Sequence, residues 1–176
     1  IHVLNIGGEY GRVELNVTLH EGADFKLGAV QIGGGSQTLE VITTVTHAEP
    51  GATSSQIVRS VLAGTATGTY LGKVAVARDA QQTDSVQSVK AMLLDRSATA
   101  NAKPELEIYA DDVKCAHGCA IGELDAMGLF YLQARGITPA EAKKLMLQAF
   151  VAGVFEGAAD EEALTEAALA KLGDLV

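Results

Sequence analysis

The feature that most constrains the fold is a long region of strand-like alternation with no helix-sized gaps. From residue 1 to about 113, apolar residues recur at every second position, as in Val13, Leu15 and Val17. The expected strands cover 13–19, 25–32, 39–46, 57–62, 69–76, 86–94 and 105–113. A parallel sheet with helical crossovers is excluded, because each crossover needs a dozen or more residues.

Two all-β architectures fit this pattern, a hairpin-built sandwich and a β-solenoid. Hairpin signals are poor, since there is no Asn-Gly or Asp-Gly pair, and glycine runs occur only at 7–8 and 33–35. Small residues and Thr recur at strand ends, as in 65–69, and such residues suit the tight corners of a solenoid. Strand spacing is irregular, so the pattern alone leaves both architectures open.

The remaining residues have helical periodicity. We expect helices over 125–135, from 139 to about 156, and from a cap at Asp160 to about 172. Thr138, Pro139 and Glu141 form a capping box with proline at the first helical position, and Gly136 and Gly157 fit helix ends. The expected division is a β part over 1–123 and a helical part over 124–176.

The second expected helix is apolar on two faces. One face carries Ala142, Leu145, Met146, Ala149, Phe150 and Gly153, and the other carries Leu147, Val151, Val154 and Phe155. A helix of this kind is either sandwiched between other elements or docks a partner.

Charge and cysteine content limit the partners and the cellular compartment that we expect for this protein. Lys and Arg number 13 against 22 Asp and Glu, a net charge of −9, which argues against nucleic acid and anionic membranes as partners. Two cysteines form no disulfide framework, and there is no signal peptide or long apolar span. We therefore expect a reducing cytoplasm. The chain starts inside an apolar alternation without Met, so we expect a fragment of a longer protein.

Candidate ligands gather at Cys115, His117 and Cys119. Thiolate and imidazole suit zinc, ferrous iron and iron–sulfur species, but three ligands do not close a tetrahedral site. In an extended segment the three side chains point to one side. The alternative is two small buried thiols and a hydrogen-bonded histidine at a strand end.

Other polar residues give weaker signals. Asp111 and Asp112 are either paired catalytic or metal-binding acids or, more commonly, a solvated pair where a strand ends. His20 and His47 are expected on the solvent side of strands. No G-x-S-x-G elbow and no phosphate-binding loop is present.

The segment 106–150, which reads LEIYADDVKCAHGCAIGELDAMGLFYLQARGITPAEAKKLMLQAF, resembles the C-terminal portion of the SufB/SufD family of iron–sulfur cluster assembly scaffolds. Upstream pieces at 46–47, 54–56, 72–74, 81–84 and 103–107 also resemble it. Within the family, the KC-x-HG form at 114–118 is similar to the SufD branch.

This resemblance implies a right-handed parallel β-helix followed by a small helical domain. It implies a non-catalytic scaffold that pairs with a SufB-like subunit and docks a SufC-like ATPase. His117, and less surely Cys115, would be cluster ligands near the subunit interface, whereas Cys119 has no support from the resemblance. The cluster would be transient and shared with SufB, and none is expected in the isolated fragment. The candidate docking residues are Phe130, Tyr131, Leu147, Val151 and Phe155.

Three rival interpretations remain at this point. The chain could be a homodimeric SufB-like scaffold, a metal-dependent solenoid enzyme that uses Asp111, Asp112 and His117, or a purely structural interaction module. An open solenoid edge could also pair two copies of this chain.

Overall fold

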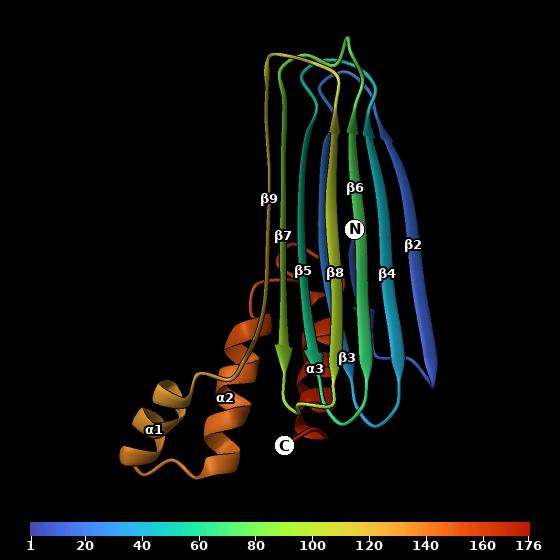
Figure 1. Cartoon of the computed structure of the whole chain (residues 1–176). Helices are drawn as coiled ribbons and strands as arrows, with labels where there is room; N and C mark the ends of the chain where they lie inside the picture. The colour runs from blue at the N-terminus through green and yellow to red at the C-terminus, as the bar shows by residue number, and fades with distance from the viewer.

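The computed structural model describes residues 1–176 as nine parallel-paired strands followed by three helices (Figure 1). Odd-numbered strands form a five-stranded sheet in the order β1-β3-β5-β7-β9, and even-numbered strands form a four-stranded sheet in the order β2-β4-β6-β8. The strands are β1 (His2–Asn5), β2 (Tyr10–Leu19), β3 (Asp24–Gly33), β4 (Thr38–His47), β5 (Thr53–Leu62), β6 (Thr67–Val76), β7 (Thr83–Leu93), β8 (Thr99–Ile108) and β9 (Val113–Glu123).

Each strand pairs in parallel with the strand two places along the chain, so consecutive strands alternate between the two sheets. This is a β-solenoid of about four turns, which confirms the solenoid alternative and excludes the sandwich. The register moves by 28 residues between Tyr10 and Thr38 and by 32 between Thr67 and Thr99. The variable turn length explains why the sequence has no strict repeat.

The strand expected over 105–113 is wrong, because the chain turns a corner between Ile108 and Val113. Residues on either side of that corner belong to β8 and β9, which lie in different sheets. Pro104 lies inside β8. Because proline is unusual within a strand, the sequence pattern did not predict a strand over 99–108. Since β8 is the edge strand of its sheet, the missing N–H of Pro104 costs the sheet little.

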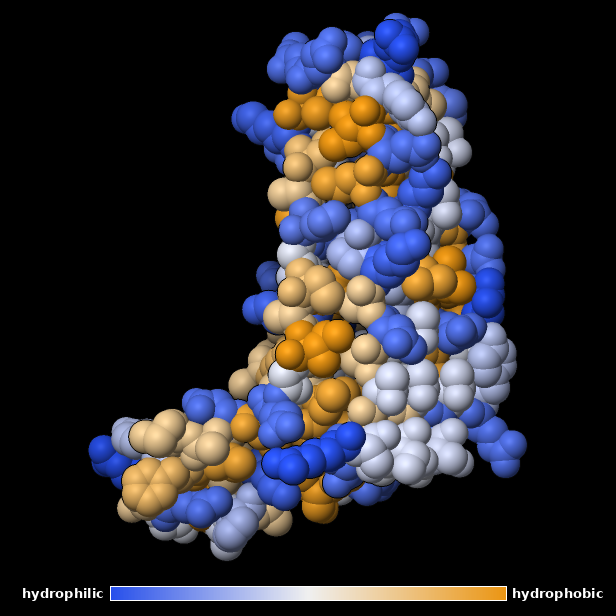
Figure 2. Space-filling view, viewed as in Figure 1, coloured by the Kyte–Doolittle hydropathy of each residue, from blue (hydrophilic) through white to orange (hydrophobic).

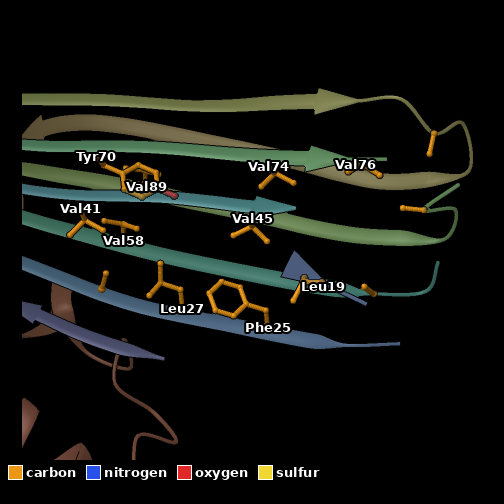
Figure 3. Packing of buried hydrophobic residues seen from close by; sticks show 14 residues of the cluster. Leu19, Phe25, Leu27, Val41, Val45, Val58, Tyr70, Val74, Val76 and Val89 are labelled. Carbon is orange, nitrogen blue, oxygen red and sulfur yellow. The ribbon is translucent and has the colours of Figure 1, made fainter. Parts of the chain in front are cut away.

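The space between the two sheets is filled by inward-pointing side chains (Figure 3). Fourteen buried residues form this cluster, and apolar side chains such as Val41, Val45 and Val58 alternate with outward-pointing residues along each strand. The burial of these side chains is the main free-energy term that holds the turns together.

Corners between strands need unusual backbone conformations. Gly51 has φ +71° and occupies one corner, while Gln82 occupies the corresponding corner of the next turn with φ 59°. The backbone N–H of Gly51 donates to the Gln81 carbonyl, and that of Gln82 donates to the Asp112 carbonyl. Successive corners therefore stack as the strands do.

The helices are α1 (Ala126–Ala134), α2 (Pro139–Val151) and α3 (Glu161–Gly173). The capping box of Thr138 and Glu141 is confirmed, and Gly136 has the expected positive φ of 88°. Helix α2 ends at Val151 rather than near residue 156, because the chain turns at Gly153 with φ +76°. Asp160 precedes α3 but makes no side-chain cap hydrogen bond.

Helices α2 and α3 cover the outer face of the five-stranded sheet. Val30, Ile32 and Val61 of the sheet share one buried cluster with side chains of these helices. Gly28 permits the close approach, because a Cβ at this position would lie 2.0 Å from the carbonyl oxygen of Val154. The last strand ends at Glu123, and the helices that follow share a hydrophobic cluster with the sheet. No helix is both long and apolar enough to span a membrane.

Candidate functional site at the end of the solenoid

The candidate ligands lie on β9, the edge strand of the five-stranded sheet. Cys115, His117 and Cys119 are in register with Ser85, Gln87 and Val89 of β7, which are all buried between the sheets. Because side chains alternate along a strand, the three ligands continue the inward-pointing row. The expectation that they point to one side is therefore confirmed, and they lie within the last strand rather than beyond its end.

The three side chains differ in exposure. Cys115 is half-buried and packs against the core cluster between the sheets, whereas His117 and Cys119 are exposed. Both cysteines are free thiols. Since the four-stranded sheet ends at β8, no further strand of that sheet lies over the inward row of β9. This row is therefore an open end of the solenoid interior.

The thiol of Cys115 is held in its neutral form. Burial raises its pKa, and the carboxylate of Asp84 adds to the rise, while the backbone of Ser85 opposes it. A metal or iron–sulfur species bound here would have to displace the thiol proton.

A column of buried polar side chains lies directly under His117. Gln87 is in register with His117, and Gln56 is in register with Gln87. The Nε2 atom of Gln87 donates to the Tyr70 hydroxyl at 3.2 Å, and that hydroxyl donates to Gln56 Oε1 at 3.2 Å. Thr43 also donates to Gln56 Oε1, at 2.8 Å. The pattern could have revealed these glutamines, because they occupy the same inward row as Val58 and Val89.

A second polar column lies under Cys115. Ser85 and Ser54 approach each other with 2.8 Å between their Oγ atoms, and Ser54 Oγ lies 2.9 Å from His47 Nε2. The expected solvent-side position of His47 is therefore wrong, because this residue is fully buried. It stands two residues after Val45, in the inward row of β4, whereas His20 is exposed as expected.

The paired acids do not join these ligands. Asp111 and Asp112 are exposed at the corner before β9, and the backbone N–H of Asp112 donates to Gln81 Oε1 at 2.9 Å. No three His, Cys, Asp or Glu side chains are close enough together to hold one metal ion. The site that the enzyme alternative requires is thus not formed by Asp111, Asp112 and His117.

Only two neighbouring side chains of the inward row of β9 can bind the same metal ion. Alternate residues of a strand are about 6.6 Å apart, so His117 and one cysteine can converge on one ion, but Cys115 and Cys119 are about twice as far apart. Any complete site needs further ligands from outside this row.

The candidate docking residues fall into two groups. Phe130 and Tyr131 of α1 are 66% and 58% exposed. Helix α1 buries none of its residues and extends away from the solenoid beside α2. Figure 2 shows apolar surface over this projecting part of the molecule. By contrast Leu147, Val151 and Phe155 are buried against the sheet and α3, so the sandwiched alternative accounts for them.

Sequence comparisons agree with this architecture. A family model described as "SUF system FeS cluster assembly, SufBD core domain" matches residues 1–150. The chain is 30% identical over 173 residues to the iron–sulfur cluster assembly protein SufD of Escherichia coli strain K12, a match that covers 98% of this chain and 41% of that protein. It is 32% identical over 154 residues to an iron–sulfur cluster assembly SufBD family protein of Synechocystis, covering 87% and 34%.

A third relative is the chloroplastic protein ABCI7 of Arabidopsis thaliana. It is 36% identical over 160 residues, which cover 87% of this chain and 33% of that protein. The chain thus spans about a third to two fifths of the length of these curated relatives.

Proposed function

The chain belongs to the SufBD family of the SUF iron–sulfur cluster assembly system, and on that premise we propose that it acts as a SufD-like scaffold subunit. In this role it makes and breaks no covalent bond catalytically. It supplies a rigid solenoid, a row of soft donors and a docking surface. The observation that carries the proposal is the Cys115–His117–Cys119 row on an exposed edge strand.

Pairing with a SufB-like subunit would use the free edge of β9. An edge strand presents unpaired N–H and C=O groups, which favour the addition of a strand from another chain. From Ala116 to Gly122 the outward row of β9 carries only alanine and glycine, and Ile121 on the inward row is 48% exposed. Another copy of this chain is the competing occupant of this edge.

The cluster is the cargo of this system, held transiently at the paired edge. His117 is the leading ligand because its imidazole is exposed at the open end, and Cys115 is the second candidate. Ligands from the partner would complete the coordination that the row cannot complete by itself.

Docking of a SufC-like ATPase would use α1. Phe130 and Tyr131 form an exposed aromatic pair there, and aromatic residues are frequent anchors at protein interfaces. The guanidinium carbon of Arg135 lies 5.1 Å from the centroid of the Tyr131 ring, within the range of a cation–π contact. Leu147, Val151 and Phe155 would then hold α2 and its following connection against the sheet and α3 rather than contact the partner.

The test is co-expression of the full-length protein with its SufB-like and SufC-like partners, followed by measurement of subunit ratio, iron and acid-labile sulfide. His117→Ala is expected to lower iron and sulfide while the complex still forms. His20→Ala is the matched control, because that exposed histidine pairs with Glu49 far from β9. Equal cluster content in His117→Ala and wild type would remove His117 from the site.

In the same experiment Tyr131→Lys is expected to lower the ATPase content without a change in the SufB-like subunit. Lys144→Ala on the exposed side of α2 serves as the control. If Tyr131→Lys retains the full ATPase content, α1 is not the docking surface. If wild-type protein purifies only with copies of itself, the homodimeric scaffold replaces the proposal.

A further inference from the structure

The buried amide of Gln87 lies one strand below His117 and carries an oxygen atom without a hydrogen-bond partner. Gln87 is 1% exposed, and its Oε1 atom accepts no hydrogen bond. The two residues are partners in register on adjacent parallel strands, which lie about 4.8 Å apart. Buried carbonyl oxygens are almost always paired, yet no donor in this structure, His117 included, bonds this oxygen, so it is an acceptor open to a donor that turns toward it.

The orientation of the amide indicates where that donor lies. Gln87 Nε2 donates to the Tyr70 hydroxyl, which in turn donates to Gln56 Oε1 on the next deeper strand. The nitrogen and oxygen of a planar amide lie at opposite corners. Because the nitrogen is hydrogen-bonded to Tyr70, which belongs to the deeper turn, the oxygen is the amide atom available to the turn that carries β9.

The amide of Gln56 offers a rival donor to this oxygen. Gln56 Nε2 is also buried without a partner. It belongs to the deeper turn, which the nitrogen of Gln87 faces. A carbonyl oxygen has two lone pairs, so a bond from Gln56 would still leave one acceptor site for His117.

We propose that Gln87 is the positioning residue of His117, and that its Oε1 accepts one imidazole N–H. The other ring nitrogen of the neutral imidazole is then left with its lone pair free at the open end. Ligating histidines commonly donate their second ring N–H to such an acceptor, which fixes both the tautomer and the ring orientation. The nature of the ligand bound by His117 rests on the proposed function, whereas the hydrogen bond itself does not.

Neither neighbouring position under the row could take this role. Ser85, under Cys115, already shares its hydroxyl with Ser54, and Val89, under Cys119, has no polar atom. Of these three residues of β7, only Gln87 has both a long side chain and an acceptor atom without a hydrogen bond. The hydrogen bond between these two residues can be tested without any metal.

The test is nitrogen-15 NMR of this chain with labelled histidine, at a pH where the imidazole is neutral. Long-range proton–nitrogen correlations show which ring nitrogen carries the hydrogen. Wild-type His117 is expected to have one tautomer, and Gln87→Met, which removes the acceptor at similar volume, is expected to give both. Gln56→Met is the matched control, because it removes the same buried amide one turn deeper and should leave His117 unchanged.

Gln87→Glu keeps an acceptor at the same place and is expected to retain the wild-type tautomer. Two tautomers in the wild type, or an unchanged single tautomer in Gln87→Met, would overturn the proposal. A second readout is cluster content in the assembled complex, which is expected to fall about tenfold in Gln87→Met and not in Gln56→Met. A tautomer change without loss of cluster would uphold the hydrogen bond and instead contradict the ligand role of His117.

Discussion

Replacement of Leu147 by alanine tests whether the helices and the solenoid form one cooperative unit. The Leu147 side chain is fully buried in the cluster that joins α2 and α3 to the outer face of the five-stranded sheet. The substitution removes three carbon atoms from the core, which at about 0.8 kcal/mol each lowers the free energy of unfolding by about 2.4 kcal/mol. A residual cavity adds about 1 kcal/mol or more, so the expected loss is about 3–4 kcal/mol.

The measurement is urea unfolding followed by circular dichroism, with thermal unfolding as a second probe. For a chain of this length a loss of 3–4 kcal/mol corresponds to a fall in Tm of about 6–16 °C. Leu145→Ala is the control, since this leucine lies on the same helix, is 46% exposed and undergoes the same change in helix propensity. A loss below about 1 kcal/mol in Leu147→Ala, or equal losses in both variants, would refute the packing of α2 against the sheet.

Two further predictions concern the sheet itself. Gly28→Ala is expected to lower the free energy of unfolding by about 1–3 kcal/mol in urea titrations, because the new Cβ would collide with the Val154 carbonyl; Gly118→Ala on β9, which has no atom within 4 Å of the added carbon, should cost far less. An equal loss of stability in the two variants would mean that the connection after α2 does not pack against β3 at Gly28. Burial lowers the pKa of His47, so the unfolded chain takes up its proton first, and stability falls as the pH drops from about 7.5 toward 5.5. His47→Gln removes this contribution, so the loss of stability between these two pH values should be smaller than in the wild type, and an equal loss would argue against a buried neutral His47.

Much of the fold was predictable because the inward rows are mostly apolar. Alternation identified Val41, Val45 and their neighbours as one face, and the absence of crossover helices excluded other parallel sheets. Corner residues and strand ends were harder to place. The acid pair at 111–112 turned out to be such a corner, where the chain passes from one sheet to the other.

The candidate site was predictable in its residues but not in its surroundings. Spacing by two placed Cys115, His117 and Cys119 on one face, yet the register with Ser85 and Gln87 depends on pairing across about 30 residues, which local patterns do not encode. His47 shows the same limit in reverse. Because histidine is polar, His47 was expected to face solvent. It lies two residues after Val45, however, so both side chains point into the space between the sheets, where the Ser54 hydroxyl lies beside the His47 ring.

The stacking of equivalent positions in register has a consequence for how such a chain can change. At present β9 covers the inward row of β7, which contains Ser85, Gln87 and Val89. A further turn inserted after β9 would cover Cys115, His117 and Cys119 in the same way. The inward row of the new strand would then be the exposed one. Chemistry in a solenoid therefore belongs to a position at the end of the stack rather than to any one strand. The two exposed inward positions of the last strand, His117 and Cys119, can be exchanged while the turns beneath keep their packing, whereas Cys115 also packs against the core.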